Sequence, residues 1–182
     1  MLAVVMCGGR GSRLNFIEKP MLEFGGKKLI DFAVQEIELA EVDGIFVTSR
    51  FTKRTEEYLK SLGCEVFRGS GSGYMKDLLL AVSEYGIVEP VLSLNADLYY
   101  YSKGVVSEVI SKYFKITSPA LSVRYEDMKP VGINVFDPFF ERQEEEIFII
   151  SKSVVLNVDT FEELKVLGWT STTREGGEWW KS

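Results

Sequence analysis

The first hundred residues alternate between short apolar segments and longer amphipathic ones. The apolar segments have the length of buried strands, and they occupy residues 2–7, 44–48, 65–67 and 90–94. Between them, apolar side chains recur at helical spacing, over residues 27–40, 52–62 and 75–84. In the second of these helices we expect Tyr58, Leu59 and Leu62 to face inward. A regular alternation of strand and helix predicts a parallel sheet with helices on both faces.

The second half of the chain is less regular. A helix is predicted over residues 103–114, with Phe114 as the last of its apolar residues. Four short β-rich segments and a short helix follow, over residues 119–125, 132–137, 145–151, 153–160 and 160–167. We therefore predict one α/β domain over residues 1–168, with three layers and a mostly parallel central sheet. Residues 169–182 form a tail that the pattern does not assign, and it contains Trp179 and Trp180.

The composition excludes several classes of function. The chain has 182 residues, of which 46% are hydrophobic, and a formal net charge of −6. Such an acidic protein is poorly suited to bind nucleic acid along its phosphate backbone. The chain contains no histidine, which excludes a Ser–His–Asp triad, a Cys–His pair and a histidine-ligated metal site. If the protein is an enzyme, its chemistry must run without imidazole.

The two cysteines and the first apolar segment bear on the compartment. Cys7 and Cys64 are too few for a disulfide scaffold or a zinc site, so we expect free thiols. Residues 2–7 are too short for the apolar part of a signal peptide. No apolar stretch approaches the length of a membrane span. We therefore expect a cytoplasmic protein without a membrane span.

A glycine-rich, basic loop follows the first predicted strand. It reads GGRGSRL over residues 8–14, and Lys19 and Pro20 come shortly after it. Glycine lets backbone N–H groups approach an anion, and arginine and lysine side chains pair with phosphate oxygens. The loop matches neither the Walker A pattern nor the dinucleotide-binding pattern, because Leu14 stands where the third glycine of the latter belongs. Its residues indicate phosphate binding and leave an ordinary basic surface loop open as the alternative.

Residues 8–14, followed by Lys19-Pro20-Met21, resemble the signature loop of the nucleotidyltransferases, with Ser12 where threonine is usual. That group includes the sugar-1-phosphate nucleotidyltransferases and the molybdenum-cofactor guanylyltransferases. Four later segments are similar to the archaeal adenosylcobinamide-phosphate guanylyltransferases, namely residues 70–78, 130–135, 143–150 and 156–164. The resemblance implies a Rossmann-like fold of the nucleotide-diphospho-sugar transferase type. It also implies an enzyme of cobalamin biosynthesis that transfers GMP from GTP to adenosylcobinamide phosphate and releases pyrophosphate.

The resemblance also implies roles for individual residues. Arg13 and Lys19 would neutralise charge on the triphosphate, and Asp97 would bind Mg²⁺ beside the α-phosphate. The other expected site residues would surround the substrates; they are Gly8, Gly9, Arg10, Gly11, Ser12, Gly71, Ser72, Gly73, Tyr74, Asn95, Gly132, Asn134 and Asn157. A phosphate nucleophile is already deprotonated near neutral pH, so this reaction needs no histidine as general base.

Several of these residues have an alternative that the sequence leaves open. Asp97 could cap a following helix, and Asp159 could serve the site or only an Asx-turn. Residues 71–74 could read the guanine base or form a flexible connection. Asp77 could be a helix cap or a solvated charge. For Gly132 we expect that the missing side chain lets a ligand approach the backbone.

The function has alternatives too. The signature loop fits an enzyme with another acceptor, such as a molybdenum-cofactor guanylyltransferase or a sugar-1-phosphate nucleotidyltransferase. A different class is a non-catalytic, nucleotide-binding regulatory protein. The presence of both Lys19 and Asp97 counts against that class, because a regulator needs neither. The sequence is also compatible with a homodimer.

Overall fold

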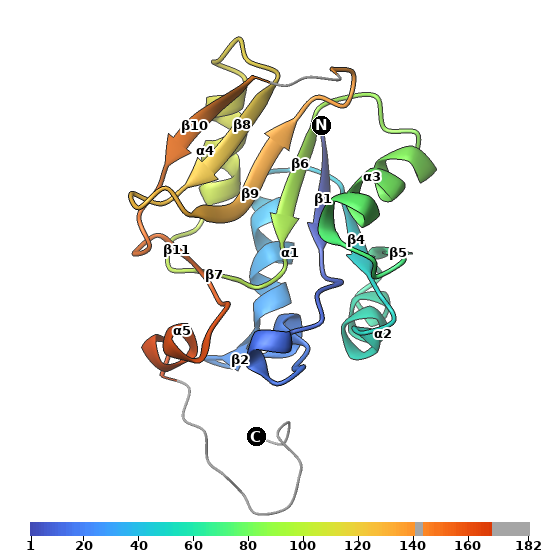
Figure 1. Ribbon diagram of the computed structural model, residues 1–182, viewed down its shortest axis with the longest axis vertical. Helices are drawn as coiled ribbons and strands as arrows, with labels where there is room; N and C mark the ends of the chain where they lie inside the picture. The colour runs from blue at the N-terminus through green and yellow to red at the C-terminus, as the bar shows by residue number, and fades with distance from the viewer. Residues whose placement is uncertain (141–143, 169–182) are drawn as a thin grey trace, which may run out of the picture.

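The computed structural model describes residues 1–140 and 144–168, and the tail with Trp179 and Trp180 lies outside them. A seven-stranded sheet in the order β10-β8-β9-β6-β1-β4-β5 forms the centre (Figure 1). Its strands are β1 (Leu2–Met6), β4 (Gly44–Thr48), β5 (Glu65–Arg68), β6 (Val91–Asn95), β8 (Ala120–Arg124), β9 (Pro130–Phe136) and β10 (Glu145–Ile149). Two small sheets pair β2 (Glu23–Phe24) with β3 (Lys27–Lys28) and β7 (Leu98–Tyr100) with β11 (Val155–Asn157). The helices are α1 (Leu29–Leu39), α2 (Lys53–Ser61), α3 (Tyr74–Glu84), α4 (Val105–Tyr113) and α5 (Phe161–Val166), and two 3-10 turns are η1 (Ser12–Leu14) and η2 (Lys19–Met21).

Strand β9 runs against its neighbours in the central sheet. It is antiparallel to β6 and β8, whereas β1 is parallel to β4 and β6, β4 to β5 and β8 to β10. The chain builds outward from β1 to β5 and then returns to β6 on the other side of β1. Open α/β sheets bind ligands at such a reversal, beyond the carboxyl ends of the strands. The predicted α/β fold with a mostly parallel sheet is therefore confirmed.

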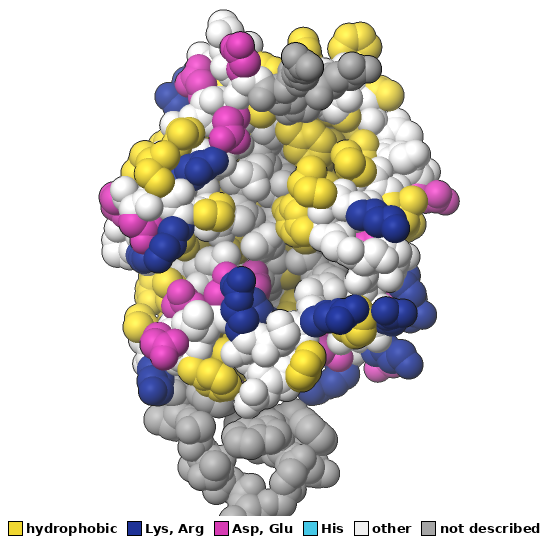
Figure 2. Space-filling view, in the orientation of Figure 1, with side chains coloured by type: hydrophobic (Ala, Val, Ile, Leu, Met, Phe, Trp, Pro, Cys, Tyr) yellow, Lys and Arg dark blue, Asp and Glu magenta, His cyan; other side chains and the backbone are white. Residues whose placement is uncertain are grey.

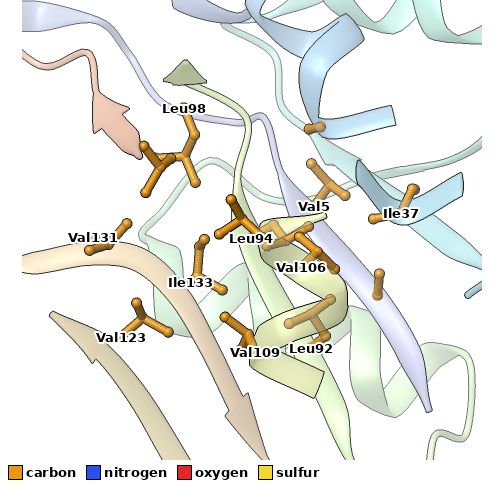
Figure 3. Packing of buried hydrophobic residues seen from close by; sticks show 14 of the residues in the cluster. Val5, Ile37, Leu92, Leu94, Leu98, Val106, Val109, Val123, Val131 and Ile133 are labelled. Atoms are coloured by element: carbon orange, nitrogen blue, oxygen red, sulfur yellow. The ribbon is translucent and has the colours of Figure 1, made fainter. Parts of the chain in front are cut away.

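Helices α1, α2 and α4 pack on one face of the sheet, and α3 packs on the other. Because successive strand residues point to opposite faces, Val5, Leu92 and Leu94 meet Ile37 of α1 and Val106 of α4 in the main core (Figure 3). The neighbouring strand residues form a second core under α3. That second core consists of Val4, Val47, Val91, Leu78, Ala81 and Val82.

The half of the sheet formed by β9, β8 and β10 has one face without a covering helix among the described residues (Figure 1). In Figure 1 no described helix lies in front of these strands. A row of paired residues crosses this face from the sheet edge inward, in the order Ile147, Ser122, Asn134 and Ser93. At the edge, Ile147 and Ile149 keep 42% and 43% of their surface exposed. We call β9, β8 and β10 the open half, and β5, β4, β1 and β6 the covered half.

The differences from the expected elements have local causes. The helix predicted from residue 27 begins at Leu29, because Lys27 and Lys28 pair with β2. Leu62 was wrongly expected to face inward. It is the C-cap residue directly after α2 and is 50% exposed, and Phe114, the C-cap residue directly after α4, is 66% exposed. The last turn therefore no longer holds either side chain on the packed face of the helix.

Two further expectations concern thiols and membranes. Cys7 and Cys64 are both free. Among residues 1–140 and 144–168, no helix combines the length and the hydropathy that crossing a membrane requires.

Candidate active site

A cavity of about 490 Å³ opens at the carboxyl ends of β1 and β6. It therefore lies at the reversal of strand order, as expected for an open α/β sheet. Its walls combine residues from four parts of the chain that are far apart in the sequence. The lining residues are Met6, Cys7, Gly8, Gly9, Arg10, Gly11, Ser12, Arg13, Lys19, Pro20, Gly71, Ser72, Gly73, Tyr74, Asp77, Asn95, Asp97 and Asp159. Thirteen of the residues expected from the sequence are in this wall.

The first wall is the signature loop, and its shape depends on Gly11. This residue has φ +60°, and a Cβ atom here would lie 2.1 Å from the carbonyl oxygen of Ile17. Its own carbonyl accepts hydrogen bonds from the N–H groups of Leu14 and Phe16. A side chain at Gly11 would therefore disrupt the turn η1 that carries Arg13. By contrast, a Cβ atom at Gly9 would meet nothing within 4 Å, so the backbone there faces open space.

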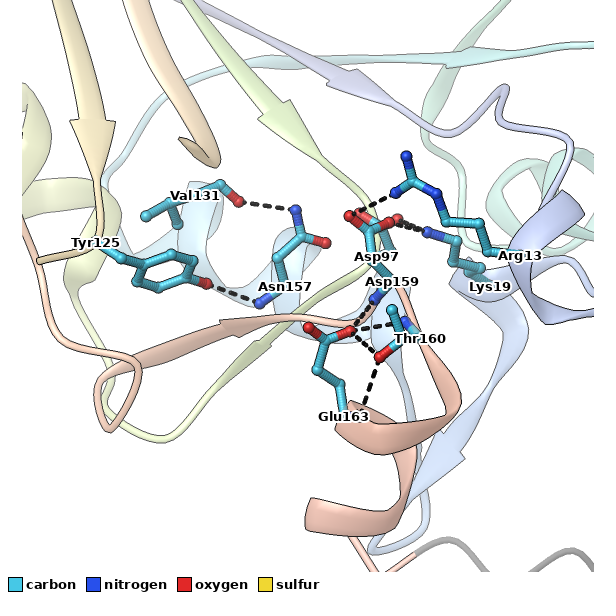
Figure 4. A network of polar contacts seen from close by, with 9 residues as sticks. All are labelled: Arg13, Lys19, Asp97, Tyr125, Val131, Asn157, Asp159, Thr160 and Glu163. Carbon is cyan, nitrogen blue, oxygen red and sulfur yellow. Dashed lines mark hydrogen bonds and ion pairs between the residues drawn. The ribbon is translucent and has the colours of Figure 1, made fainter. Parts of the chain in front are cut away.

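Lys19 forms the centre of the charged network in Figure 4. Its Nζ atom donates to Oδ2 of Asp97 at 2.7 Å and to Oδ1 of Asp159 at 2.5 Å. The side chains of Lys19 and Asp97 are only 13% and 17% exposed. Arg13, which is 70% exposed, pairs with the other carboxylate oxygen of Asp159 at 3.3 Å. Two cations and two carboxylates thus meet at the mouth of the cavity.

The pKa values of this network follow from burial and charge. Burial alone would lower the pKa of Lys19, but the carboxylates of Asp97 and Asp159 outweigh it, and the pKa is raised. For Asp97 burial is again the largest influence, and it raises the pKa of the carboxyl although Lys19 acts in the opposite direction. Lys19 is therefore a firmly charged cation, and it offsets part of the cost of burying the charge of Asp97.

Asp159 is held in the site by the start of helix α5. The N–H groups of Asp159 and Thr160 donate to Oε2 of Glu163 at 2.8 and 2.7 Å, and Thr160 is the N-cap of the helix. The segment before Asp159 is also tied to Asp97, because the N–H of Val158 donates to the carbonyl of Asp97 at 2.9 Å. Helix α5 thus begins with a capping box at Thr160, and not with the Asx-turn that the sequence left open for Asp159. The carboxylate of Asp159 faces Lys19 instead.

Asn157 lies beside this network with one oxygen unsatisfied. Its Nδ2 donates to the carbonyl of Val131 at 3.2 Å, which fixes the orientation of the amide. Its Oδ1 is buried and has no hydrogen-bond partner among the described residues. In Figure 4 this oxygen points toward the side of Asp97. The backbone N–H of Asn157 donates to the hydroxyl of Tyr125, whose pKa burial raises to about 12.

The second glycine-rich loop is held by Asp77 from within. The carboxylate of this buried residue accepts from the N–H groups of Ser70 and Gly71, at 2.8 and 2.9 Å, and from the Ser70 hydroxyl at 2.6 Å. Asp77 is therefore not a solvated charge. It fixes the loop that leads to Ser72 and Gly73, and this order is not that of a flexible connection.

A second cavity of about 420 Å³ adjoins the first and extends over the open half. The two cavities share Tyr74, Asn95 and Asp159, and the second is also lined by Gly132, Asn134 and Asn157. Our expectation for Gly132 needs a correction. A Cβ atom there would lie 2.5 Å from Nδ2 of Asn95, so the space of the missing side chain is taken by Asn95 and not by a ligand.

Asp97 and Asp159 offer oxygen atoms that suit a hard divalent cation. Both carboxylates contact one ammonium group, so they lie within reach of a single small ion, and the orphaned oxygen of Asn157 is on the same side. Among the described residues no group of three or more His, Cys, Asp or Glu side chains could hold a metal ion. The donor set therefore fits an ion such as Mg²⁺ that takes its other ligands from water and from a bound phosphate. The alternative of a helix cap for Asp97 is excluded, because strand β7 follows it and Gly104 precedes α4.

Sequence reasoning missed the scaffolding residues of the site. It did not identify Asp77 as the anchor of the second loop, nor Glu18, whose Oε2 accepts from the N–H and the hydroxyl of Thr55 at the start of α2. Neither contact leaves a periodic signal, since each joins residues from different elements. The acidic side chain directly before Lys19-Pro20 was the available hint.

The comparisons with known proteins identify the family and the fold. Over 189 aligned residues the chain is 29% identical to the adenosylcobinamide-phosphate guanylyltransferase of Methanocaldococcus jannaschii, covering 91% of this chain and 95% of that protein. Similar folds occur in a Bacillus anthracis protein assigned as glucose-1-phosphate thymidylyltransferase and solved with sucrose (TM-score 0.72, 13% identity, 98% of both chains). Another is Rv0371C of Mycobacterium tuberculosis in complex with manganese (TM-score 0.68, 14% identity, 91% of this chain and 96% of that one). Residues 3–163 match the MobA-like NTP transferase domain. The chain thus belongs to the MobA-like NTP transferase family and is a nucleotidyltransferase.

Proposed function

We propose that this protein is a GTP:adenosylcobinamide-phosphate guanylyltransferase. In this reaction a phosphate oxygen of adenosylcobinamide phosphate attacks the α-phosphorus of GTP. A new P–O–P link forms, the bond between the α-phosphorus and its bridging oxygen breaks, and pyrophosphate leaves. The proposal includes Mg²⁺ as the metal, GTP as the nucleotide and the cytoplasm as the compartment.

The observation that carries the proposal is the position of Lys19. Its ammonium group is held between Asp97 and Asp159 at the mouth of the cavity that the signature loop lines. Reactions at phosphorus depend mainly on positioning and on neutralising charge. A fixed cation beside two carboxylates and a glycine-rich loop supplies both, and it needs no imidazole base.

The residues of the first cavity would each act on the triphosphate. The backbone at Gly8 and Gly9 would bind its oxygens, and Arg13 and Lys19 would stabilise the charge that develops on the α-phosphate and on the leaving pyrophosphate. Asp97 and Asp159, with Asn157 beside them, would hold Mg²⁺. The metal, when bound, supplies further neutralisation of the phosphate charge and orients the α-phosphate for attack.

The acceptor is assigned to the second cavity. That cavity shares Asp159 with the first and continues onto strand β9 of the open half, where Asn134 supplies a polar group to its lining. Ile147 and Ile149 supply exposed apolar surface at the edge of the same face. A corrinoid is a large ring with many amide groups, and a broad, partly apolar and partly polar surface suits it. The similarity to the Methanocaldococcus jannaschii enzyme, which spans nearly both chains, supports the same acceptor.

The decisive assay is pyrophosphate release with GTP and adenosylcobinamide phosphate in the presence of Mg²⁺. We expect release that requires both substrates and that is slower with ATP than with GTP. Parallel reactions replace the acceptor with molybdopterin or with a sugar 1-phosphate. Release with one of these and not with adenosylcobinamide phosphate would contradict the proposed acceptor. GTP binding without release on any acceptor would support the regulatory alternative instead.

A further inference from the structure

The turn between β4 and α2, residues 49–52, contacts both glycine-rich loops. The Ser49 hydroxyl donates to the carbonyl of Gly8 at 2.8 Å and accepts from the N–H of Phe51 at 3.1 Å. The Thr52 hydroxyl accepts from the N–H of Ser49 at 3.0 Å. Ser49 and Thr52 are completely buried. The turn is therefore rigid, and it fixes where the side chain of Phe51 lies.

The ring of Phe51 lies between the signature loop and the second glycine-rich loop. The guanidinium carbon of Arg10 is 4.5 Å from the ring centroid. On the other loop, a Cβ atom at Gly71 would lie 3.0 Å from Cε2 of Phe51. One aromatic side chain thus contacts a member of each loop that lines the first cavity.

A second arginine, Arg50, also lies over the ring of Phe51 and can be compared with Arg10. The guanidinium carbon of Arg50 is 4.8 Å from the centroid of Phe51. Arg10 is part of the cavity wall, whereas Arg50 is not among its lining residues. In Figure 2 lysine and arginine side chains gather over α2 and the loops beside it. Two arginines therefore share one ring, and only one of them faces the ligand.

A contact with an aromatic ring has a specific consequence for an arginine. It restricts the orientation of the guanidinium group, but unlike an ion pair it does not use the N–H donors. A side chain ordered in this way loses less conformational entropy when it binds a phosphate. The side chain of arginine is long and mobile, and the ring would keep that of Arg10 oriented toward the cavity before the nucleotide binds.

We infer that Phe51 is a positioning residue for the nucleotide. It orients Arg10 toward the triphosphate and at the same time supports the loop at Gly71, so that the two loops bind one ligand as a unit. The inference rests on the proposed function only in that the first cavity binds the nucleotide. It adds a residue outside the cavity wall, and it predicts an effect on GTP affinity that is separate from chemistry.

The test is a double-mutant cycle on GTP binding, measured by isothermal titration with Mg²⁺ and without acceptor. The F51L variant keeps apolar bulk against Gly71 but removes the ring face. We expect it to raise the dissociation constant for GTP about fivefold. R10A should weaken GTP at least as much. The double variant should be no weaker than R10A alone, because the ring then has no arginine to position. F51Y keeps the ring and should restore the affinity of the wild type.

Controls separate positioning from simple packing. R50A removes the other arginine on the same ring and should leave the dissociation constant for GTP within twofold. In turnover assays F51L should raise the KM for GTP and leave kcat nearly unchanged. A cycle in which the effects of F51L and R10A add, or an F51L variant that binds GTP as the wild type does, would overturn the inference.

The proposed nucleotide site is tested separately by K19A in the same titration. If K19A lowers the affinity for GTP while the effects of F51L and R10A add, the inference fails and the proposed nucleotide site stands. If neither K19A nor R10A changes the affinity, the nucleotide does not bind in the first cavity and the proposed function fails as well.

Discussion

The covered and open halves of the sheet are built differently, and the difference matches two kinds of ligand. In the covered half, β1 and β4 have helices on both faces, and the loops after β1 and β5 close around a cavity whose shape depends on Gly11 and Asp77. In the open half, one face of β8, β9 and β10 carries the paired residues Ser122 and Asn134 without a covering helix. The first arrangement suits a ligand of fixed shape, and the second suits a large one.

Lys19, Asp97 and Asp159 lie where the two halves meet. Asp97 follows β6 of the covered half, and Asp159 follows β11, whose partner β7 comes after Asp97. Asp159 lines both cavities. Under the proposed function, nucleotide affinity would depend on one half, acceptor affinity on the other, and turnover on the boundary between them.

The largest expected effect is at this boundary. K19A and D97A should each lower turnover at least about a hundredfold, because each removes charge stabilisation at the reacting phosphorus. The measurement is pyrophosphate release at saturating substrates, with thermal melting to show that the variants fold. K27A removes an exposed lysine that contacts Gln35 and should retain normal turnover. Near-normal turnover in both K19A and D97A would contradict the claim that catalysis depends on the boundary between the two halves.

An intermediate effect is expected in the open half. N134L removes an amide from the floor of the second cavity, and we expect the KM for the acceptor to rise about tenfold, the cost of roughly one good hydrogen bond to a ligand. The KM for GTP should stay within twofold. Q35L, an amide-to-leucine change on α1, is the matched control. An equal rise of both KM values in N134L would show that the halves do not bind separate ligands.

The smallest expected effect concerns the stability of the covered half. Burial would raise the pKa of Glu56, but hydrogen bonds from Lys60 and Arg68 outweigh it, and the pKa is lowered from its ordinary value of 4.5. A carboxyl with a lowered pKa contributes stability above that ordinary value, and the contribution is lost as the pH falls through the lowered pKa. E56Q should therefore be about 1–2 kcal/mol less stable at pH 7. The difference in free energy of unfolding should shrink below about pH 4.5, and urea melts at pH 7 and pH 3.5 measure it. A difference that is the same at both pH values would show that the ionised carboxylate contributes nothing.

The covered half was also the more predictable one. Strand β4 has the bounds that its apolar run predicted, and the signature loop lies in the cavity as its glycines and arginines indicated. These features are local, because a buried strand or a turn glycine is visible in its own few residues. The strands β2, β3 and β7 escaped prediction, since two or three residues carry no period. The first two pair with each other across a short turn, and β7 pairs with the distant β11.

The contacts that shape the site could not be predicted from the sequence, because they are not local. Gly132 makes room for Asn95, and Phe51 contacts both Arg10 and Gly71. Each pair brings together residues from different strands or loops. Single residues such as glycine or phenylalanine fit many roles, and only the fold selects one of them. The sequence therefore predicted which residue types are needed, but not which partners hold them in place.

The central claim is that nucleotide and acceptor bind to different halves of one sheet. A crystal structure with a non-hydrolysable GTP analogue and Mg²⁺ tests it most directly. We predict the triphosphate on residues 8–13, the base beside residues 71–74, and the second cavity at Asn134 left free for the acceptor. A nucleotide bound over β8 and β9 would contradict the account.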